Sequence, residues 1–88
     1  MTDLTPLTEI ETLKKAIRYR AEHRGTKEAD WLIGGFIRSH ISDFSNEEIH
    51  HLKSLVDLDD ESFFKQVDSP QKPYLMLIQL FKTYKDSL

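Results

Sequence analysis

Apolar residues recur at helical intervals along almost the whole of this 88-residue chain. Within each stretch they stand three or four positions apart, which places them on one face of a helix, and no alternating strand pattern occurs. The pattern predicts helices over residues 8–23, 27–40, 45–56, about 60–67 and 73–84. The side chains expected on the apolar faces are Ile10, Leu13, Ile17, Ala21, Ala29, Leu32, Ile33, Phe36, Ile37, His40, Ile49, Leu52, Leu55, Val56, Phe63, Phe64, Val67, Tyr74, Leu77, Ile78, Phe81 and Tyr84.

These helices and their short connections predict an all-α fold, a compact bundle of about five short helices. A chain of 88 residues forms one domain, residues 1–88, and we expect flexible ends at about 1–7 and 85–88. Capping-box spacing occurs at 8–11 and 45–48. Asp59 or Asp60 can cap the fourth helix, and Pro73 suits the first position of the last helix.

The second predicted helix is apolar on more than one face, which is typical of a central helix. Trp31, Gly34 and Gly35 lie on the side opposite its main apolar stripe. Adjacent glycines weaken a helix, so their presence indicates that another backbone passes close by. We expect core packing for Trp31 and for both glycines.

Composition narrows the class of protein. Apolar residues make up 39% of the chain and charged residues 31%, which suits a soluble globular domain. Without cysteine the chain can form neither disulfides nor thiolate metal sites, and no apolar run approaches the roughly 20 residues of a membrane span. The first residues, 1–6, lack the basic and apolar regions of a secretory signal. We therefore expect no membrane insertion and a cytoplasmic location in a bacterium, or an equivalent such as the mitochondrial matrix.

The charge is unevenly spread. Residues 14–27 hold six basic residues against Glu22 alone, a net +5, whereas residues 43–68 hold eight acids against two lysines, a net −6. This polarity can steer a charged partner. The overall charge of −3 argues against non-specific nucleic-acid binding, and we expect no nucleic-acid partner.

No catalytic constellation is found. The four histidines show no metal-ligand spacing, because His50 and His51 point roughly 100° apart on a helix. The acidic run 57–61 lacks the glycine that a calcium loop needs at its sixth position, which is Ser62. Phosphate-binding and nucleophile-elbow motifs are missing as well. We predict no catalytic residue and no metal site.

The segment between the first two helices has the features of a helix corner. Gly25 suits the position after a helix end, because glycine adopts positive φ without strain. Arg24 lies where a cation favours the carbonyl end of the preceding helix. Thr26 can cap the next helix, which places Glu28 in its first turn.

The same segment reads Arg24-Gly25-x-x-Glu28-x-Asp30, and it follows Tyr19-Arg20. With the Leu32–Phe36 and Leu55–Phe64 stretches, it resembles the flavin-attachment assembly factors of succinate dehydrogenase, the SdhE family. The resemblance covers roughly residues 13–67.

The resemblance implies a helical assembly factor that binds the flavoprotein subunit of succinate dehydrogenase, or of fumarate reductase for some members. It implies promotion of covalent FAD attachment to that partner, with the FAD held by the partner and no cofactor held stably by this chain. We expect a monomer that is not itself an enzyme. The residues expected at the partner interface are Arg24, Gly25, Glu28, Asp30, Arg20, His23 and Tyr19.

Individual roles follow from the resemblance and from helix geometry. Gly25 would let the partner's backbone approach closely, and Arg24 would offer a forked donor to a partner carboxylate or carbonyl. Glu28 would accept hydrogen bonds near the partner's flavin site. Asp30 stands about 200° from Glu28 around the helix, so we expect it to brace the corner through Arg24 or Lys27 while Glu28 faces outward.

Two alternatives remain open on the sequence. The chain could be a small helical interaction adaptor of another system, for which Arg24-Gly25 is only a helix corner. It could also be a helix-turn-helix DNA binder that uses the basic segment 14–27. Glu28, Asp30 and Trp31 on the presumed recognition helix weigh against DNA binding.

Overall fold

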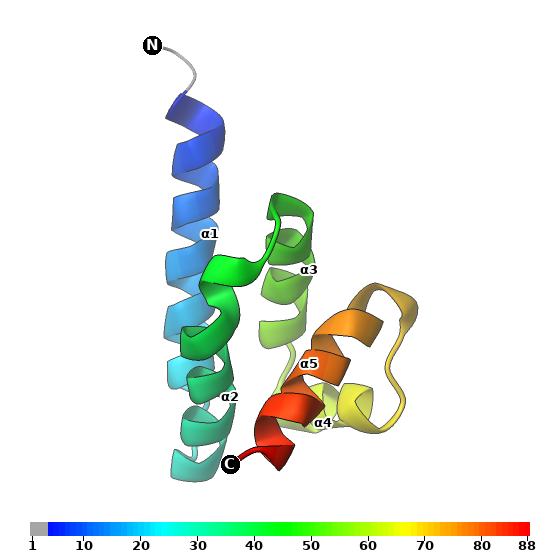
Figure 1. Ribbon diagram of the computed structural model, residues 1–88. Coiled ribbons are helices and arrows are strands. Elements are labelled where there is room, and N and C mark those ends of the chain that lie inside the picture. Colours follow the sequence, from blue (N-terminus) through cyan, green and yellow to red (C-terminus); the bar gives the residue numbers. More distant parts are fainter. Residues whose placement is uncertain (1–3) are drawn as a thin grey trace.

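The computed structural model describes residues 4–88, with side chains from residue 9 onward. Over this range the chain is helical, and the described residues contain no strand (Figure 1). The all-α prediction is confirmed. The elements are α1 (Leu4–Glu22), α2 (Lys27–His40), the 3-10 turn η1 (Ile41–Asp43), α3 (Asn46–Val56), α4 (Asp60–Asp68), the 3-10 turn η2 (Lys72–Tyr74) and α5 (Leu75–Asp86).

The first three α-helices run up and down beside one another. Helix α1 packs against both α2 and α3, and the first turns of α1 extend beyond the ends of its neighbours (Figure 1). Helices α4 and α5 lie to one side, and α5 returns across α4 so that the C-terminus ends beside α2. The α1–α2 corner and the α3–α4 corner therefore lie at the same end of the bundle.

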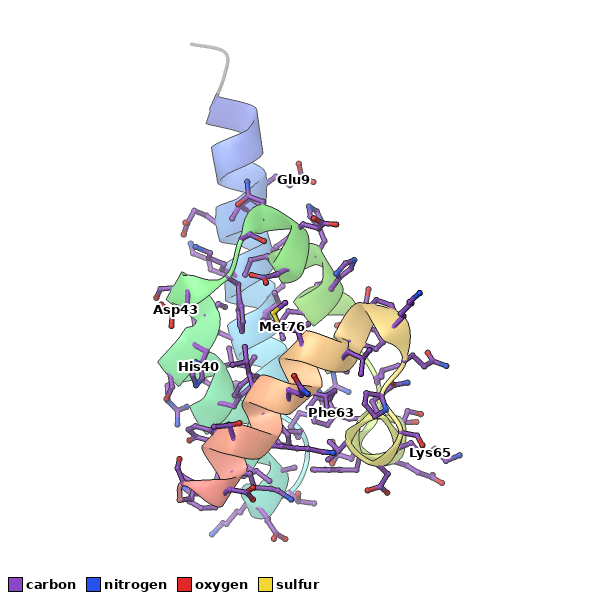
Figure 2. The ribbon with its side chains drawn as sticks, turned by 45° about the vertical axis from the view of Figure 1, so that its right-hand side comes forward. Glu9, His40, Asp43, Phe63, Lys65 and Met76 are labelled. Atoms are coloured by element: carbon purple, nitrogen blue, oxygen red, sulfur yellow. The ribbon has the colours of Figure 1, made fainter. Side chains whose placement is uncertain are left out.

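Three phenylalanines pack against one another between α2, α4 and α5. The Phe81 ring meets the rings of Phe36 and Phe63 edge to face, with centroid separations of 5.4 Å in both pairs. All three side chains are almost fully buried. Figure 2 shows Phe63 directed toward α5 and Lys65 pointing away from the bundle, which is the alternation expected of an amphipathic helix.

Most of the predicted helix ends are confirmed. Helix α2 spans the predicted residues, and α3 begins with a complete capping box in which Ser45 accepts from the Glu48 N–H and Glu48 accepts from the Ser45 N–H. Asp59, rather than Asp60, caps α4 by accepting from the Ser62 N–H at 2.8 Å. Pro73 lies in η2 rather than at the start of α5.

The predicted start of the first helix at residue 8 is wrong, because α1 begins at Leu4. Pro6 falls in the first turn, where backbone N–H groups have no acceptor within the helix, so it does not stop the helix. Residues 4–7 and 85–86, which were predicted as flexible ends, belong to α1 and α5. The predicted flexible residues 1–3 lie outside the described range.

The expectation of core packing for Trp31 is also wrong, since 58% of this residue is exposed. Both glycines of α2 are buried as expected. A Cβ at Gly34 would lie 3.4 Å from the carbonyl oxygen of Ala21, so the backbone of α1 does pass close by. At Gly35 the neighbour is instead a side chain, the hydroxyl of Tyr84 on α5.

Candidate functional site

The α1–α2 corner is a tight turn that requires glycine. Gly25 has a φ of +110°, a conformation that other residues rarely adopt. A Cβ built at Gly25 would meet no atom within 4 Å. Glycine is therefore required here by the backbone conformation and not by a lack of space within the chain. Thr26 caps α2 as predicted, its Oγ1 accepting from the Ala29 N–H at 3.2 Å. The corner therefore exposes backbone that carries no side chain at Gly25.

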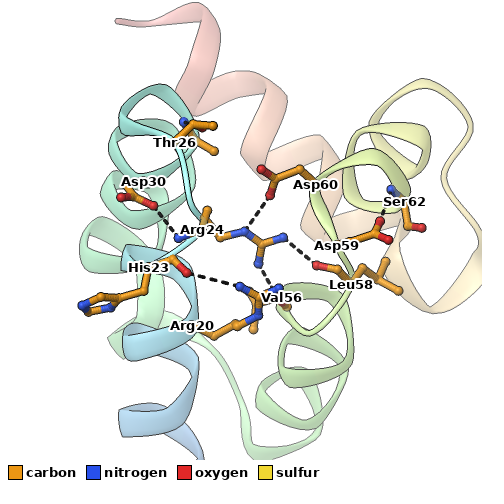
Figure 3. Close-up of polar contacts among 11 residues, drawn as sticks. Arg20, His23, Arg24, Thr26, Asp30, Val56, Leu58, Asp59, Asp60 and Ser62 are labelled. Carbon is orange, nitrogen blue, oxygen red and sulfur yellow. Dashed lines mark hydrogen bonds and ion pairs between the residues drawn. The ribbon is translucent and has the colours of Figure 1, made fainter.

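Arg24 ties this corner to the α3–α4 corner (Figure 3). Its Nε donates to Oδ1 of Asp60 at 2.9 Å, and its Nη2 donates to the carbonyl oxygen of Leu58 at 2.5 Å. Its Nη1 donates to the carbonyl oxygen of Val56, the last residue of α3. The guanidinium also lies 5.8 Å from the centre of the Phe63 ring. Arg24 thus caps the carbonyl end of α3 and pairs with the first residue of α4.

This arrangement corrects the expectation that Arg24 offers its forked donor to a partner. The side chain of Arg24 is 0% exposed, and its donors are directed at groups of its own chain. The carbonyl end that it stabilises belongs to α3 and not to the preceding helix α1. A buried arginine whose three nitrogens each donate to a group of its own chain acts by holding the fold together. Its contribution to a binding surface is to fix the two corners relative to each other.

Asp30 and Glu28 divide their roles in the expected directions. Oδ1 of the half-buried Asp30 accepts a hydrogen bond from the backbone N–H of Arg24, so Asp30 braces the corner through the backbone of Arg24. Glu28 is exposed in the first turn of α2. Among the described residues it has no ion-pair partner. Glu28 therefore offers an uncommitted carboxylate beside the corner.

Tyr19, Arg20 and His23 form a cluster at the end of α1. The Tyr19 and His23 rings stack with centroids 4.1 Å apart and an interplanar angle of 21°. Nδ1 of His23 lies 2.8 Å from the Tyr19 carbonyl oxygen, which can only accept, so Nδ1 carries the proton. Nη1 of Arg20 donates to the His23 carbonyl oxygen at 3.3 Å. Tyr19 and His23 are exposed, and the exposed Gly25 follows only two positions after His23.

The α3–α4 corner carries one group with a shifted pKa. The pKa of Asp59 lies below its ordinary value of 3.8, chiefly because the backbone N–H of Ser62 donates to its carboxylate. The positive charges of Arg24 and Arg20 act in the same direction. The cap of α4 is therefore ionised at neutral pH.

A cleft between α2 and α4 adjoins the corner, and no local pattern in the sequence predicts it. Its volume is about 250 Å³, and it is lined by Thr26, Glu28, Ala29, Leu32, Asp60 and Phe64. The sequence held one signal, the Leu55–Phe64 stretch of the resemblance. By themselves, the acids of that stretch predict only a helix cap.

Two further observations concern the described residues alone. Among them, no group of three or more histidine, aspartate or glutamate side chains is arranged to hold a metal ion. None of the helices within residues 4–88 combines the length and the apolar character that crossing a membrane would require.

Sequence comparison with known proteins finds relatives of this chain over the range that contains the two corners. The sequence profile of a family described as "Flavinator of succinate dehydrogenase" matches residues 15–85, a range that includes both corners and the cleft. A relative from Acetobacter pasteurianus, named FAD assembly factor SdhE, is 34% identical over 47 residues. That match covers 53% of this chain and 43% of the relative, so less than half of the relative's length is matched. No solved structure matches the chain. Because the profile extends over most of the sequence, the chain belongs to the succinate dehydrogenase flavinator family.

Proposed function

We propose that this chain binds the flavoprotein subunit of succinate dehydrogenase and promotes the covalent attachment of FAD to it. The family match over residues 15–85 carries the proposal. The corner geometry supports it, because Gly25 and Glu28 are exposed on a turn whose shape is fixed from within by Arg24 and Asp30.

The chain acts in this proposal by positioning and not by its own chemistry. On this proposal the bond joins the flavin to the partner, so both reacting groups belong to the partner complex. Orienting two reactants can supply a large part of a barrier reduction, and a small rigid domain docked on the maturing subunit can provide that orientation. The FAD stays with the partner, and the chain holds no cofactor stably.

The proposed docking surface combines the bare backbone at Gly25, the Tyr19–His23 stack and the carboxylate of Glu28. Exposed aromatic side chains are frequent anchors in interfaces. A glycine with open space around it lets a partner backbone approach within van der Waals distance. We further propose that the chain acts as a monomer in the cytoplasm or an equivalent matrix.

The test measures in-gel flavin fluorescence of the denatured flavoprotein from cells with the wild-type chain, without it, and with two variants. Gly25→Arg and Gly25→Ala carry the same backbone strain, because both place a side chain at a φ of +110°. Only arginine adds bulk on the docking surface. We expect no covalent flavin without the chain, little with Gly25→Arg and substantially more with Gly25→Ala. Unchanged flavin in cells that lack the chain would refute the proposal.

A further inference from the structure

We infer that the cleft between α2 and α4 receives a basic side chain of the partner flavoprotein, an arginine or a lysine, with Glu28 as its counter-ion. The inference rests on the proposed function and adds the chemistry of one contact within it. Three features of the described residues carry it, namely the shape of the cleft, the charge of its lining and an exposed tryptophan three positions after Glu28 on α2.

The lining separates apolar from polar groups. Ala29, Leu32 and Phe64 supply hydrocarbon from two helices, and the carboxylates of Glu28 and Asp60 supply the charge. A long basic side chain has the matching division, because its methylene stem packs on apolar surface while its charged end stays near water. The volume of about 250 Å³ is enough to hold a single side chain rather than a folded segment.

The charge of the lining selects a cation. Glu28 and Asp60 are the charged residues of the cleft wall, and no basic residue lines it. Oδ1 of Asp60 already accepts from Arg24, whose positive charge lies behind the wall with 0% of the side chain exposed. Glu28 has no such compensation among the described residues. An uncompensated carboxylate at the rim of a cleft favours a positively charged occupant.

Trp31 supplies the independent observation. Trp31 stands three positions after Glu28 on α2, so these two side chains are neighbours on the helix surface, and Trp31 lies outside the lining of the cleft. Trp31 is 58% exposed, and it is the chain's only tryptophan. The face of an indole ring attracts cations more strongly than any other side-chain ring, and tryptophan is enriched among residues that dominate binding energy. Both the charge in the cleft and the ring next to Glu28 therefore favour the same kind of ligand.

The test compares the affinity of the full chain for the purified flavoprotein subunit between wild type and Glu28→Gln, which keeps the shape of the side chain and removes its charge. We expect Glu28→Gln to weaken binding about tenfold or more, because it leaves a partner cation without its counter-ion. The loss should shrink when salt is raised from about 50 to about 500 mM, since screening weakens the wild-type contact.

The matched control is Glu61→Gln, which removes the same charge from the first turn of α4 at a position outside the cleft. It should change the affinity by less than about twofold, as expected of an exposed rim charge. Equal binding by wild type and Glu28→Gln would overturn the inference in favour of an apolar occupant, and tighter binding by Glu28→Gln in favour of an acidic one. If the wild-type chain itself neither binds the subunit nor promotes flavin attachment, the proposed function fails and the inference fails with it.

Discussion

Nε of Arg24 lies 2.9 Å from Oδ1 of Asp60, and this contact joins two helix corners that stand 36 positions apart in the chain. The same guanidinium donates to the carbonyl oxygens of Val56 and Leu58. One side chain therefore holds the α1–α2 corner against the α3–α4 corner. The arginine of the family motif is, in this chain, a structural residue beneath the surface that it was expected to occupy.

Arg24→Ala should lower the free energy of unfolding by about 2–4 kcal/mol, chiefly because two carbonyl oxygens lose a charged donor, whereas Asp60 is 35% exposed and can turn to water. Two carbonyl oxygens and Asp60 would lose their donor. Arg24→Lys should recover only part of the loss, because one ammonium cannot reproduce a planar fork. Urea unfolding measures both variants. Arg20→Ala, whose guanidinium makes one 3.3 Å contact with a backbone carbonyl, serves as the control and should cost about 1 kcal/mol or less.

Gly25→Ala should lower the free energy of unfolding by about 1–2 kcal/mol, the usual strain of a side chain at positive φ. Gly25→Arg should lower it by about the same amount, because a Cβ at this position meets no atom within 4 Å. Thermal unfolding of the two variants measures the comparison. A much larger loss for arginine would mean that the chain itself, and not a partner, fills the space beside Gly25.

The effect of Gly35→Ala on the free energy of unfolding should depend on the hydroxyl group of Tyr84. A Cβ at Gly35 would clash with the Tyr84 hydroxyl, whereas the ring carbon Cζ would lie at an ordinary 3.4 Å. The Tyr84 ring is held against Phe36 and His40, which restricts its movement away. In the Tyr84→Phe background, Gly35→Ala should therefore stabilise the helix by about 0.5–1 kcal/mol, and in the wild type it should be less favourable. A double-mutant cycle by urea unfolding measures this difference, and additive effects would contradict it.

Acid should remove one identified contribution to stability. The pKa of Asp59 is lowered in the folded chain, so its ionised form stabilises the fold fully above the unfolded-state pKa of about 3.9. That contribution is lost as the pH falls through the lowered folded value. Asp59→Asn keeps a capping oxygen but cannot titrate, so stability should depend less steeply on pH below about 4 in this variant than in the wild type. Thermal unfolding across a pH series measures the two slopes, and identical slopes would exclude Asp59 as a source.

Trp31→Ala should change the free energy of unfolding by no more than about 0.5 kcal/mol, as expected of an exposed side chain. In the free chain the indole fluorescence should be quenched readily by acrylamide, because 58% of the residue is exposed. Weak quenching, or a loss of several kcal/mol, would show that Trp31 is packed in the way that the sequence suggested.

The helices themselves were predictable because their signals are local. The apolar stripe of residues 27–40 and the cap at Ser45 need no knowledge of distant residues, and both predictions are confirmed. The position of Gly25 after a helix likewise predicts its positive φ. The start of α1 was missed because a capping-box spacing at 8–11 occurs inside a helix that begins earlier.

The interior role of Arg24 could not be predicted because two of its acceptors are backbone carbonyls. Every residue carries a carbonyl, so the side chains at 56 and 58 give no sign of the contact. The exposure of Trp31 has a similar cause. Helix α2 is apolar on several faces, and the packing of α1 and α5 against it, which is not local in sequence, decides which apolar residue stays uncovered. The cleft forms where α2 and α4 pack together, and this tertiary contact has no local signal in the sequence.

The internal bracing of the corner bears on the kinetics and entropy of recognition. Residues 23–26 lie between two helices, where a free loop would sample many conformations. Ordering such a loop on binding would cost about 1–2 kcal/mol for each residue fixed. The bonds from Arg24 to α3, α4 and Asp30 impose that order during folding, so a partner meets a surface already in its final shape. The chain can then bind by rigid docking and leave again without refolding.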